Sequence, residues 1–477
     1  MAGVNGLTCH QRLCEPSKVL PAAGTGTPWH AVAMPTLLND MSPERANQVF
    51  MHPIHQEVFP TLVQLISDLR RCRSYRDYAV FQEELLSKVL EVQRHRSACR
   101  ESAHRLRDGR QILPTAPELR SGVPADDPES WEIEADVCER VDRQLRSVAD
   151  AMAWRVFHYD RQVIVALSRN QSSGPMAGRQ GLEAERAFVA EWTKDENCFV
   201  LMHDLTSCLR IGDATLFKSI GGGYEAYLYE IKSDPQRRKS KQLRRQRLAE
   251  EAIRDGGPLP DDPDGRLVAL TTPYKTYLGM LRDAFDLARR DGVRGVKIPG
   301  GMALVASDMH RGYERWSEEE FLAHTGIEHR GAMKRAGILG VGNHVTYFSN
   351  DYAARTPIMP PWAIYPLAPL DCAKLIVDMA VYIVTVSSES LLGALRNAGL
   401  AAEWVLPSGP LDLQGQIILR AHNGQCGIEM RPSEMQRLLL ELVDLPTWAE
   451  GVRELLSRSE TGTRPWPSFA DERKAWA

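Results

Sequence analysis

Three consecutive glycines at 221–223 constrain this chain more than any other feature, because they separate two runs of alternating side chains (IGDATLFKSIGGGYEAYLYEIKS, 211–233). Alternation with a period of two predicts β-strands. A Gly-Gly pair tolerates the positive φ angles of a two-residue hairpin turn. If the turn is centred between the first two glycines, Asp213 on the first strand lies directly opposite Glu230 on the second.

This pair of acids predicts a metal site. Two carboxylates side by side on a half-buried sheet repel each other unless protons or a cation neutralise them. Ligation by oxygen alone favours a hard ion, Mg²⁺ or Mn²⁺. Lys232 lies one strand step after Glu230, where an ammonium group can hold a water molecule and stabilise charge on a phosphate. A metal ion held by Asp213 and Glu230, a bound water and Lys232 together favour hydrolysis of a phosphodiester bond.

The helices predicted on either side of the strands add polar candidates. In the helix at 181–192, the apolar residues cluster on one side and Glu185 falls in the middle of that side. A buried acid is costly unless it is paired or bound to a metal, so Glu185 is the third acidic candidate. In the helix after the strands, Gln242 and Gln246 share a stripe with apolar residues and are expected to reach the site or its substrate.

A run of positive charge follows the lysine strand. Its members are Arg237, Arg238, Lys239, Lys241, Arg244, Arg245 and Arg247. The formal net charge of the chain is -4, so any contact with nucleic acid must come from a local patch of this kind. A solvated helix face would explain the same run equally well.

These motifs together resemble the PD-(D/E)XK nuclease superfamily over residues 181–275. The resemblance consists of G-x-x-x-E in a helix (181–185), GD in a strand (212–213), ExK in the next strand (230–232) and the helix that carries the glutamines. The sequence departs from the name-giving motif at Gly212, where the motif has proline.

The resemblance implies an α/β fold with a restriction-endonuclease-like αβββαβ core. It also implies that Asp213, Glu230 and the backbone carbonyl of Ile231 bind Mg²⁺, while Lys232 orients or activates the attacking water. We therefore expect a Mg²⁺-dependent endonuclease that acts on DNA rather than RNA, in restriction or defence. Two alternatives remain: a catalytically inactive nucleic-acid-binding module on the same fold, and a sensor or interaction protein.

Changes in periodicity and in proline content predict the domain organisation. The segment 355–371 carries five prolines and is expected to mark a boundary. The predicted units are an irregular N-terminal arm (1–40), a helical module (41–175), the nuclease-like core (176–275), a helix and strand extension of the core (276–356) and a small C-terminal α/β unit (371–477). The N-terminal helices are expected to offer a surface to a partner protein or a second copy.

The cellular compartment is inferred from cysteines and apolar segments. Nine cysteines are scattered without CxxC pairs, which is typical of a reducing compartment. The longest apolar stretch, 373–386, is short and broken by Asp378, so it is expected to be a buried element and not a membrane span. The prediction is a cytoplasmic protein with no membrane partner.

Overall fold

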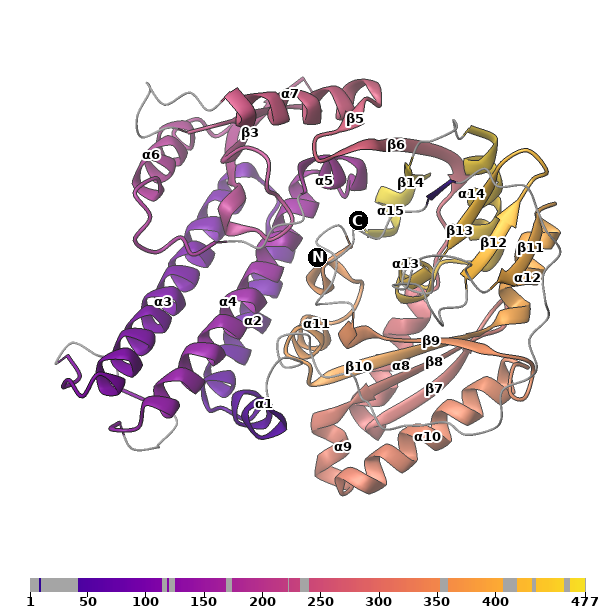
Figure 1. The fold of residues 1–477 in the computed structure, drawn as a ribbon, viewed down its shortest axis with the longest axis horizontal. Helices are drawn as coiled ribbons and strands as arrows, with labels where there is room; N and C mark the ends of the chain where they lie inside the picture. The colour runs from indigo at the N-terminus through magenta and orange to yellow at the C-terminus, as the bar shows by residue number, and fades with distance from the viewer. Residues whose placement is uncertain are drawn as a thin grey trace.

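The computed structural model describes residues 8–9, 42–113, 118–119, 125–168, 174–221, 223–231, 240–351, 359–405, 418–430, 435–458 and 464–476. Within them the chain is mixed α/β, as predicted, and a layer of long helices lies beside four small β-sheets (Figure 1). None of the described helices is long and apolar enough to cross a membrane. No disulfide bond joins the described cysteines.

The helical module consists of α1 (Pro43–Phe50), α2 (Ile54–Arg71), α3 (Tyr75–Arg107), α4 (Pro128–Val156) and α5 (Arg161–Leu167). Side-chain caps set where the two longest helices begin. Ser74 and Asp77 form a capping box at the start of α3, and Asp127 accepts hydrogen bonds from the first turn of α4. The two helices pack side by side along most of their length (Figure 1).

The predicted hairpin belongs to an antiparallel sheet of three described strands in the order β2 (Cys198–Met202), β3 (Ala214–Ile220) and β4 (Gly223–Tyr229). Both faces of this sheet are covered. Phe217 packs beside Tyr75 of α3 on one face, with the two rings tilted by 49°, whereas Leu216 packs with Phe188 of α6 (Leu182–Trp192) on the other. Successive side chains of a strand point to opposite faces. Because both faces of the sheet are covered, neighbouring residues of β3 are buried whichever face they point to.

The outer edge of β2 is bonded by a helix side chain. Gln82 of α3 donates from Nε2 to the carbonyl of Val200 at 2.9 Å, and its Oε1 accepts from the backbone nitrogen of Met202 at 3.0 Å. The carboxamide therefore occupies the place that another strand would take. An uncovered strand edge invites non-native pairing, so this contact also protects the sheet.

The last strand of the predicted αβββαβ order joins a different sheet. After α7 (Ser240–Asp255), β6 (Asp262–Pro273) pairs in parallel with β14 (Arg464–Ala470) and antiparallel with the short β5 (Pro258–Leu259). The elements come in the predicted order, but the described residues do not gather them into one core sheet. The restriction-endonuclease-like core is therefore not confirmed.

The largest described sheet has the order β7-β8-β10-β9. Its strands are β7 (Val293–Ile298), β8 (Met302–Asp308), β9 (His344–Phe348) and β10 (Ala380–Ser387), and its helices are α8 (Leu278–Asp291), α9 (Met309–Arg315) and α10 (Glu318–Arg335). Leu304 shares a core with Phe285 of α8, whereas Val305 packs with Phe321 of α10. Helices on opposite faces explain why every residue of β8 is buried.

The proline-rich segment does not separate two sheets. β10 lies in the range 371–477, yet it pairs with β8 and β9 from the range 276–356. Between them, Trp362 and Tyr365 are buried, and the Trp362 ring lies 5.7 Å from the ring of Tyr382 in β10. The described part of the proline-rich segment is therefore packed into the core.

A fourth described sheet, in the order β1-β13-β12-β11, completes the C-terminal part. Its strands are β11 (Ala401–Val405), β12 (Ile418–His422), β13 (Gly427–Met430) and β1 (Thr8–Cys9), and the helices nearby are α11 (Pro369–Ile376), α12 (Ser388–Asn397), α13 (Gln436–Leu440), α14 (Leu445–Arg458) and α15 (Glu472–Trp476). A turn that includes Asn423 and Gly424 joins β12 to β13, with φ at 93° for the glycine. β1 is a strand within the arm that was expected to be irregular.

A buried ion cluster joins the helical module to the C-terminal helices. Arg161 of α5 contacts Glu441 at 3.0 Å and Glu472 at 2.5 Å. Arg437 of α13 reaches the same two acids, at 3.4 and 2.8 Å. Two positive and two negative charges are therefore neutralised together, away from water.

We expect Arg161→Met to lower the free energy of unfolding by about 3–5 kcal/mol, because removal of one partner leaves buried carboxylates undercompensated. Chemical denaturation followed by circular dichroism measures this loss. The matched control is Arg76→Met, whose partner Glu196 is exposed and whose loss should change stability by less than about 1 kcal/mol. Equal effects of the two substitutions would contradict the role assigned to the cluster.

Candidate functional site

The hairpin has the predicted register. Ala214 pairs with Tyr229 at one end and Ile220 with Gly223 at the turn. The same register, carried one residue further, places Asp213 across from Glu230. The backbone nitrogen of Asp213 donates to the carbonyl of Tyr229 at 2.8 Å, so the two strands are still hydrogen-bonded to each other at this end.

Gly212 lies in a bend before β3 and not in a strand, which corrects the expectation for the GD motif. Its φ angle is 78°, a value that a proline, fixed near -65°, cannot adopt. A β-carbon at this position would also lie 3.2 Å from the carbonyl oxygen of Tyr229. The glycine that replaces the motif's proline is therefore required by the local backbone.

A buried histidine supports this bend. His203, in the 3₁₀ turn η1 (His203–Leu205), lies 2.8 Å through Nδ1 from the carbonyl of Ile211 and 2.7 Å through Nε2 from the hydroxyl of Thr215. Burial lowers the pKa of His203 to about 4, so the ring is neutral. Its role is structural, since it links the two ends of the bend that presents Asp213.

Asp213 lies against the start of the ExK segment. Its Oδ2 accepts a hydrogen bond of 2.6 Å from the backbone nitrogen of Ile231, and Glu230 is half-buried beside it. The Asp213 carboxylate and the backbone of Ile231 are thus in direct contact. Lys232 lies outside the described residues.

Glu185 is buried, as predicted, with 3% of its surface exposed. Burial raises its pKa to about 7, the Arg179 guanidinium acts to lower it, and the Asp213 carboxylate acts to raise it. The effect of Asp213 identifies the two acids as electrostatic neighbours. Arg179 bridges Glu185 and Asp204, and Oε2 of Glu185 has no hydrogen-bond partner within the described residues.

Arg179 is the residue that sequence reasoning missed. It lies in the turn before α6, outside any periodic pattern, so the helical stripe gives no signal for it. A buried acid needs a counterion, and this need was the clue that the sequence offered. Arg179, which lies six residues before Glu185 in the chain, meets it.

One of the two glutamines of α7 is bonded to the hairpin. Gln246 donates from Nε2 to the carbonyl of Leu228 at 2.9 Å and contacts Glu250 at 3.0 Å, so its amide attaches α7 to β4. Gln242, one turn earlier, is half-buried. Ile253 from the same predicted stripe is exposed.

The basic run is only partly within the described structure. Arg237, Arg238 and Lys239 lie outside the described residues, as does the side chain of Lys241. Arg244 is exposed. Arg245 forms an ion pair with Asp261, which neutralises part of the patch.

Comparison of the chain with family models, with curated proteins and with solved structures gave no match. The function must therefore be inferred from the geometry and chemistry of the chain's own residues.

Glu185 should make stability depend on pH. Its carboxyl releases its proton near the ordinary value of 4.5 in the unfolded chain and near 7 in the folded chain, so the folded state binds more protons between these values. Its contribution to the free energy of unfolding should therefore fall by up to about 3 kcal/mol as the pH rises through this window. Glu185→Gln should remove that dependence in denaturation curves at several pH values.

The control for this experiment is Glu183→Gln on the exposed side of the same helix. It should keep the pH profile of the unsubstituted protein. Identical profiles for Glu185→Gln and the unsubstituted protein would refute the assigned titration.

Proposed function

We propose that this chain is a nuclease that hydrolyses phosphodiester bonds in DNA with the help of Mg²⁺ or Mn²⁺. The observation that supports it best is the register of the hairpin, which sets Asp213 opposite Glu230 with the buried Glu185 as an electrostatic neighbour of Asp213. Three carboxylates at one end of a small sheet are the donor set that a hard divalent ion prefers.

Asp213 and Glu230 are the proposed ligands, with the backbone of Ile231 beside them. Glu185 already has a counterion in Arg179, so its proposed role is to assist through the metal or a water bound to it. When bound, the ion polarises the scissile phosphate and lowers the pKa of a coordinated water.

The other proposed roles fall on positive residues. Lys232, two residues after Glu230, is proposed to orient the attacking water and to stabilise charge that develops on the phosphate. The exposed Arg244 of α7 is proposed to hold the nucleic-acid backbone, because α7 is attached to β4 through Gln246.

The test is a cleavage assay on plasmid and linear DNA and on RNA, with Mg²⁺, Mn²⁺ or EDTA. The unsubstituted protein should nick or cut DNA only when the divalent ion is present. Glu230→Gln, Asp213→Asn and Lys232→Ala should each lower the rate by at least about 100-fold, because each removes a ligand or an electrostatic group.

Glu225→Gln is the matched control for Glu230→Gln. Glu225 lies on the same strand but is exposed near the turn, so its loss should leave the cleavage rate unchanged. Equal cleavage by Glu230→Gln and Glu225→Gln, with both proteins folded by circular dichroism, would refute the assignment.

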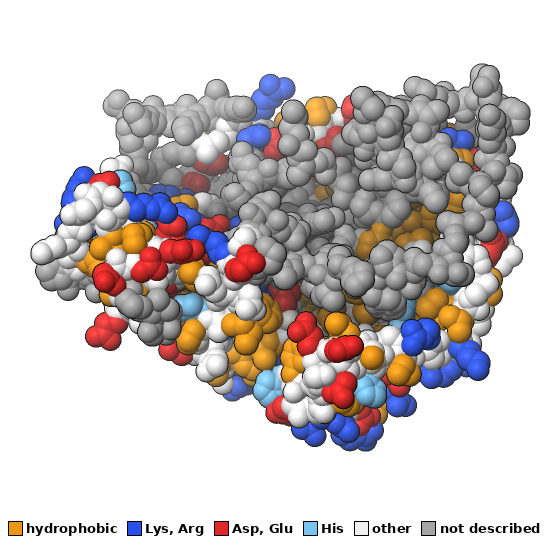
Figure 2. Space-filling view, turned by 60° about the horizontal axis from the view of Figure 1, so that its bottom comes forward, with side chains coloured by type: hydrophobic (Ala, Val, Ile, Leu, Met, Phe, Trp, Pro, Cys, Tyr) orange, Lys and Arg blue, Asp and Glu red, His pale blue; other side chains and the backbone are white. Residues whose placement is uncertain are grey.

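A second candidate is a nucleic-acid-binding module without catalysis. It is favoured by two structural contacts, the ion pair of Arg179 with Glu185 and the hydrogen bond of Gln246 to β4. Both side chains thus stabilise the fold and need not take part in catalysis. On the face shown in Figure 2, acidic and basic side chains are interspersed over the described surface. Within the helical module, Arg100 and Arg143 both pair with Glu139.

Under this second function, DNA binding should depend on salt and not on divalent ions. Arg244→Ala should weaken binding and reduce the slope of log K against log salt concentration by about 1. Fluorescence anisotropy over a salt series measures this slope. Arg254→Ala, at the far end of the same helix and already paired with Asp255, should leave the slope unchanged, and equal slopes for all three proteins would exclude α7 as the binding surface.

A further inference from the structure

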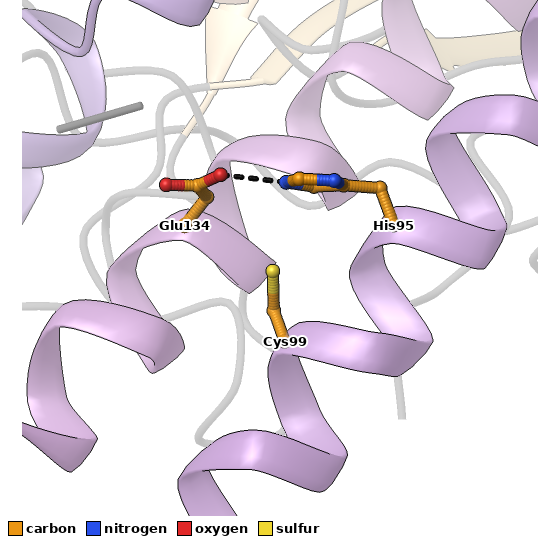
Figure 3. A group of neighbouring side chains, drawn as sticks. All are labelled: His95, Cys99 and Glu134. Carbon is orange, nitrogen blue, oxygen red and sulfur yellow. Dashed lines mark hydrogen bonds and ion pairs between the residues drawn. The ribbon is translucent and has the colours of Figure 1, made fainter. Parts of the chain in front are cut away.

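A separate group of potential ligands lies in the helical module. His95 and Cys99 of α3 and Glu134 of α4 each offer one ligand atom, and these atoms all lie within 4.8 Å of one another. Figure 3 shows the three side chains pointing toward a common centre between the two helices. Nothing in the nuclease proposal uses them.

Helix geometry explains the convergence. His95 and Cys99 are four residues apart, so they lie on one face of α3, one turn above the other. α4 packs against this face and brings Glu134 across from both. Cys99 and Glu134 are fully buried, and the His95 side chain is 16% exposed, so the group is nearly closed to water.

The donor set indicates which kind of ion would fit. A thiolate, an imidazole and a carboxylate are ligands that zinc takes in proteins, whereas Mg²⁺ avoids sulfur. In a tetrahedral zinc site the ligand atoms lie about 3.3–3.7 Å apart. Here Nε2 of His95 and Oε1 of Glu134 are hydrogen-bonded at 2.6 Å, so small rotations would open the space for an ion.

Burial adds a charge argument. A fully buried carboxylate is costly unless positive charge or hydrogen bonds compensate it. A divalent ion at the centre would stabilise both the carboxylate and the thiolate.

A second histidine, His52, lies beside Glu134. Its Nε2 is 3.7 Å from Oε2 of Glu134, and its Nδ1 accepts a hydrogen bond from the backbone nitrogen of Ile54 at 3.4 Å. That bond places the proton of the neutral ring on Nε2, the atom that faces the carboxylate. His52 is therefore suited to orient Glu134 and not to bind an ion itself.

We infer that His95, Cys99 and Glu134 form a binding site for one zinc ion, with His52 as a positioning residue. Three protein ligands leave a fourth position for water. A cavity of about 390 Å³, lined by Ala103 and Ala135 among others, lies one turn along α3 from Cys99.

The probes are Co²⁺ and Zn²⁺, added to the full-length chain after removal of metals with a chelator. One equivalent of Co²⁺ should give a thiolate-to-cobalt charge-transfer band, and Zn²⁺ should displace it and raise the melting temperature. Cys99→Ser should abolish the band. His95→Ala and Glu134→Gln should weaken Co²⁺ binding by at least about 10-fold.

Three further variants give the test its controls. Cys72→Ser removes another buried cysteine of the module and should keep the band. Asp213→Asn should keep it too, since the hairpin holds no thiol ligand. His52→Ala should keep the band but weaken binding by about 10-fold.

The absence of a cobalt band from the folded, unsubstituted chain would overturn the inference. A band of full strength in folded Cys99→Ser would also overturn it, and so would a band lost in Cys72→Ser. Circular dichroism shows which variants are folded, and Cys99→Ser, which changes one atom, is the variant on which the conclusion depends.

Discussion

The carboxamide of Gln82 on α3 is the contact on which the hairpin sheet depends, because it completes the hydrogen bonding of the outer edge of β2. A second glutamine, Gln93, follows eleven residues later, which is just over three full turns, so both amides lie on one face of α3. Gln93 accepts from the backbone nitrogens of Met176 and Ala177 at 2.7 and 2.9 Å. One face of one helix thereby positions both a strand and the segment that leads to α6.

This arrangement accounts for the electrostatics of the candidate site. The segment held by Gln93 carries Arg179 and continues into α6 with Glu185, while the sheet held by Gln82 carries Asp213 and Glu230. Because both parts are fixed to α3, the acids cannot relieve their repulsion by moving apart. The repulsion must be met by a counterion, by a retained proton or by a bound cation. At Glu185 the structure shows the counterion Arg179, while burial and the Asp213 carboxylate raise the pKa of the Glu185 carboxyl and so favour its protonated form.

The sequence predicted the parts of this site that depend on local pattern. The glycine triplet defined a symmetric turn and with it the partner of Asp213, and the helical stripe predicted that Glu185 is buried. The strand at β6 was predicted, but its partner β14 is almost two hundred residues away in the chain, and periodicity contains no information about such pairing. The prolines near Trp362 suggested a boundary. The buried aromatic contacts show instead that the segment passes through a core, and these contacts could not be predicted from the sequence. Arg179, Gln82 and the group at Cys99 were missed because each acts through a contact between elements.

The two candidate ion sites differ in their ligand types, so each site should prefer a different ion. The hairpin offers oxygen atoms alone, and such sites suit hard ions that bind weakly and keep several waters. The α3 and α4 group includes a sulfur and a nitrogen, which favour zinc by ligand type. Gln82 and His95 are thirteen residues apart on the same helix, a separation of about 20 Å. An ion held by Cys99 would therefore fasten α3 to α4 at a distance from the hairpin, and it would stabilise the helix whose glutamines hold the acids in place.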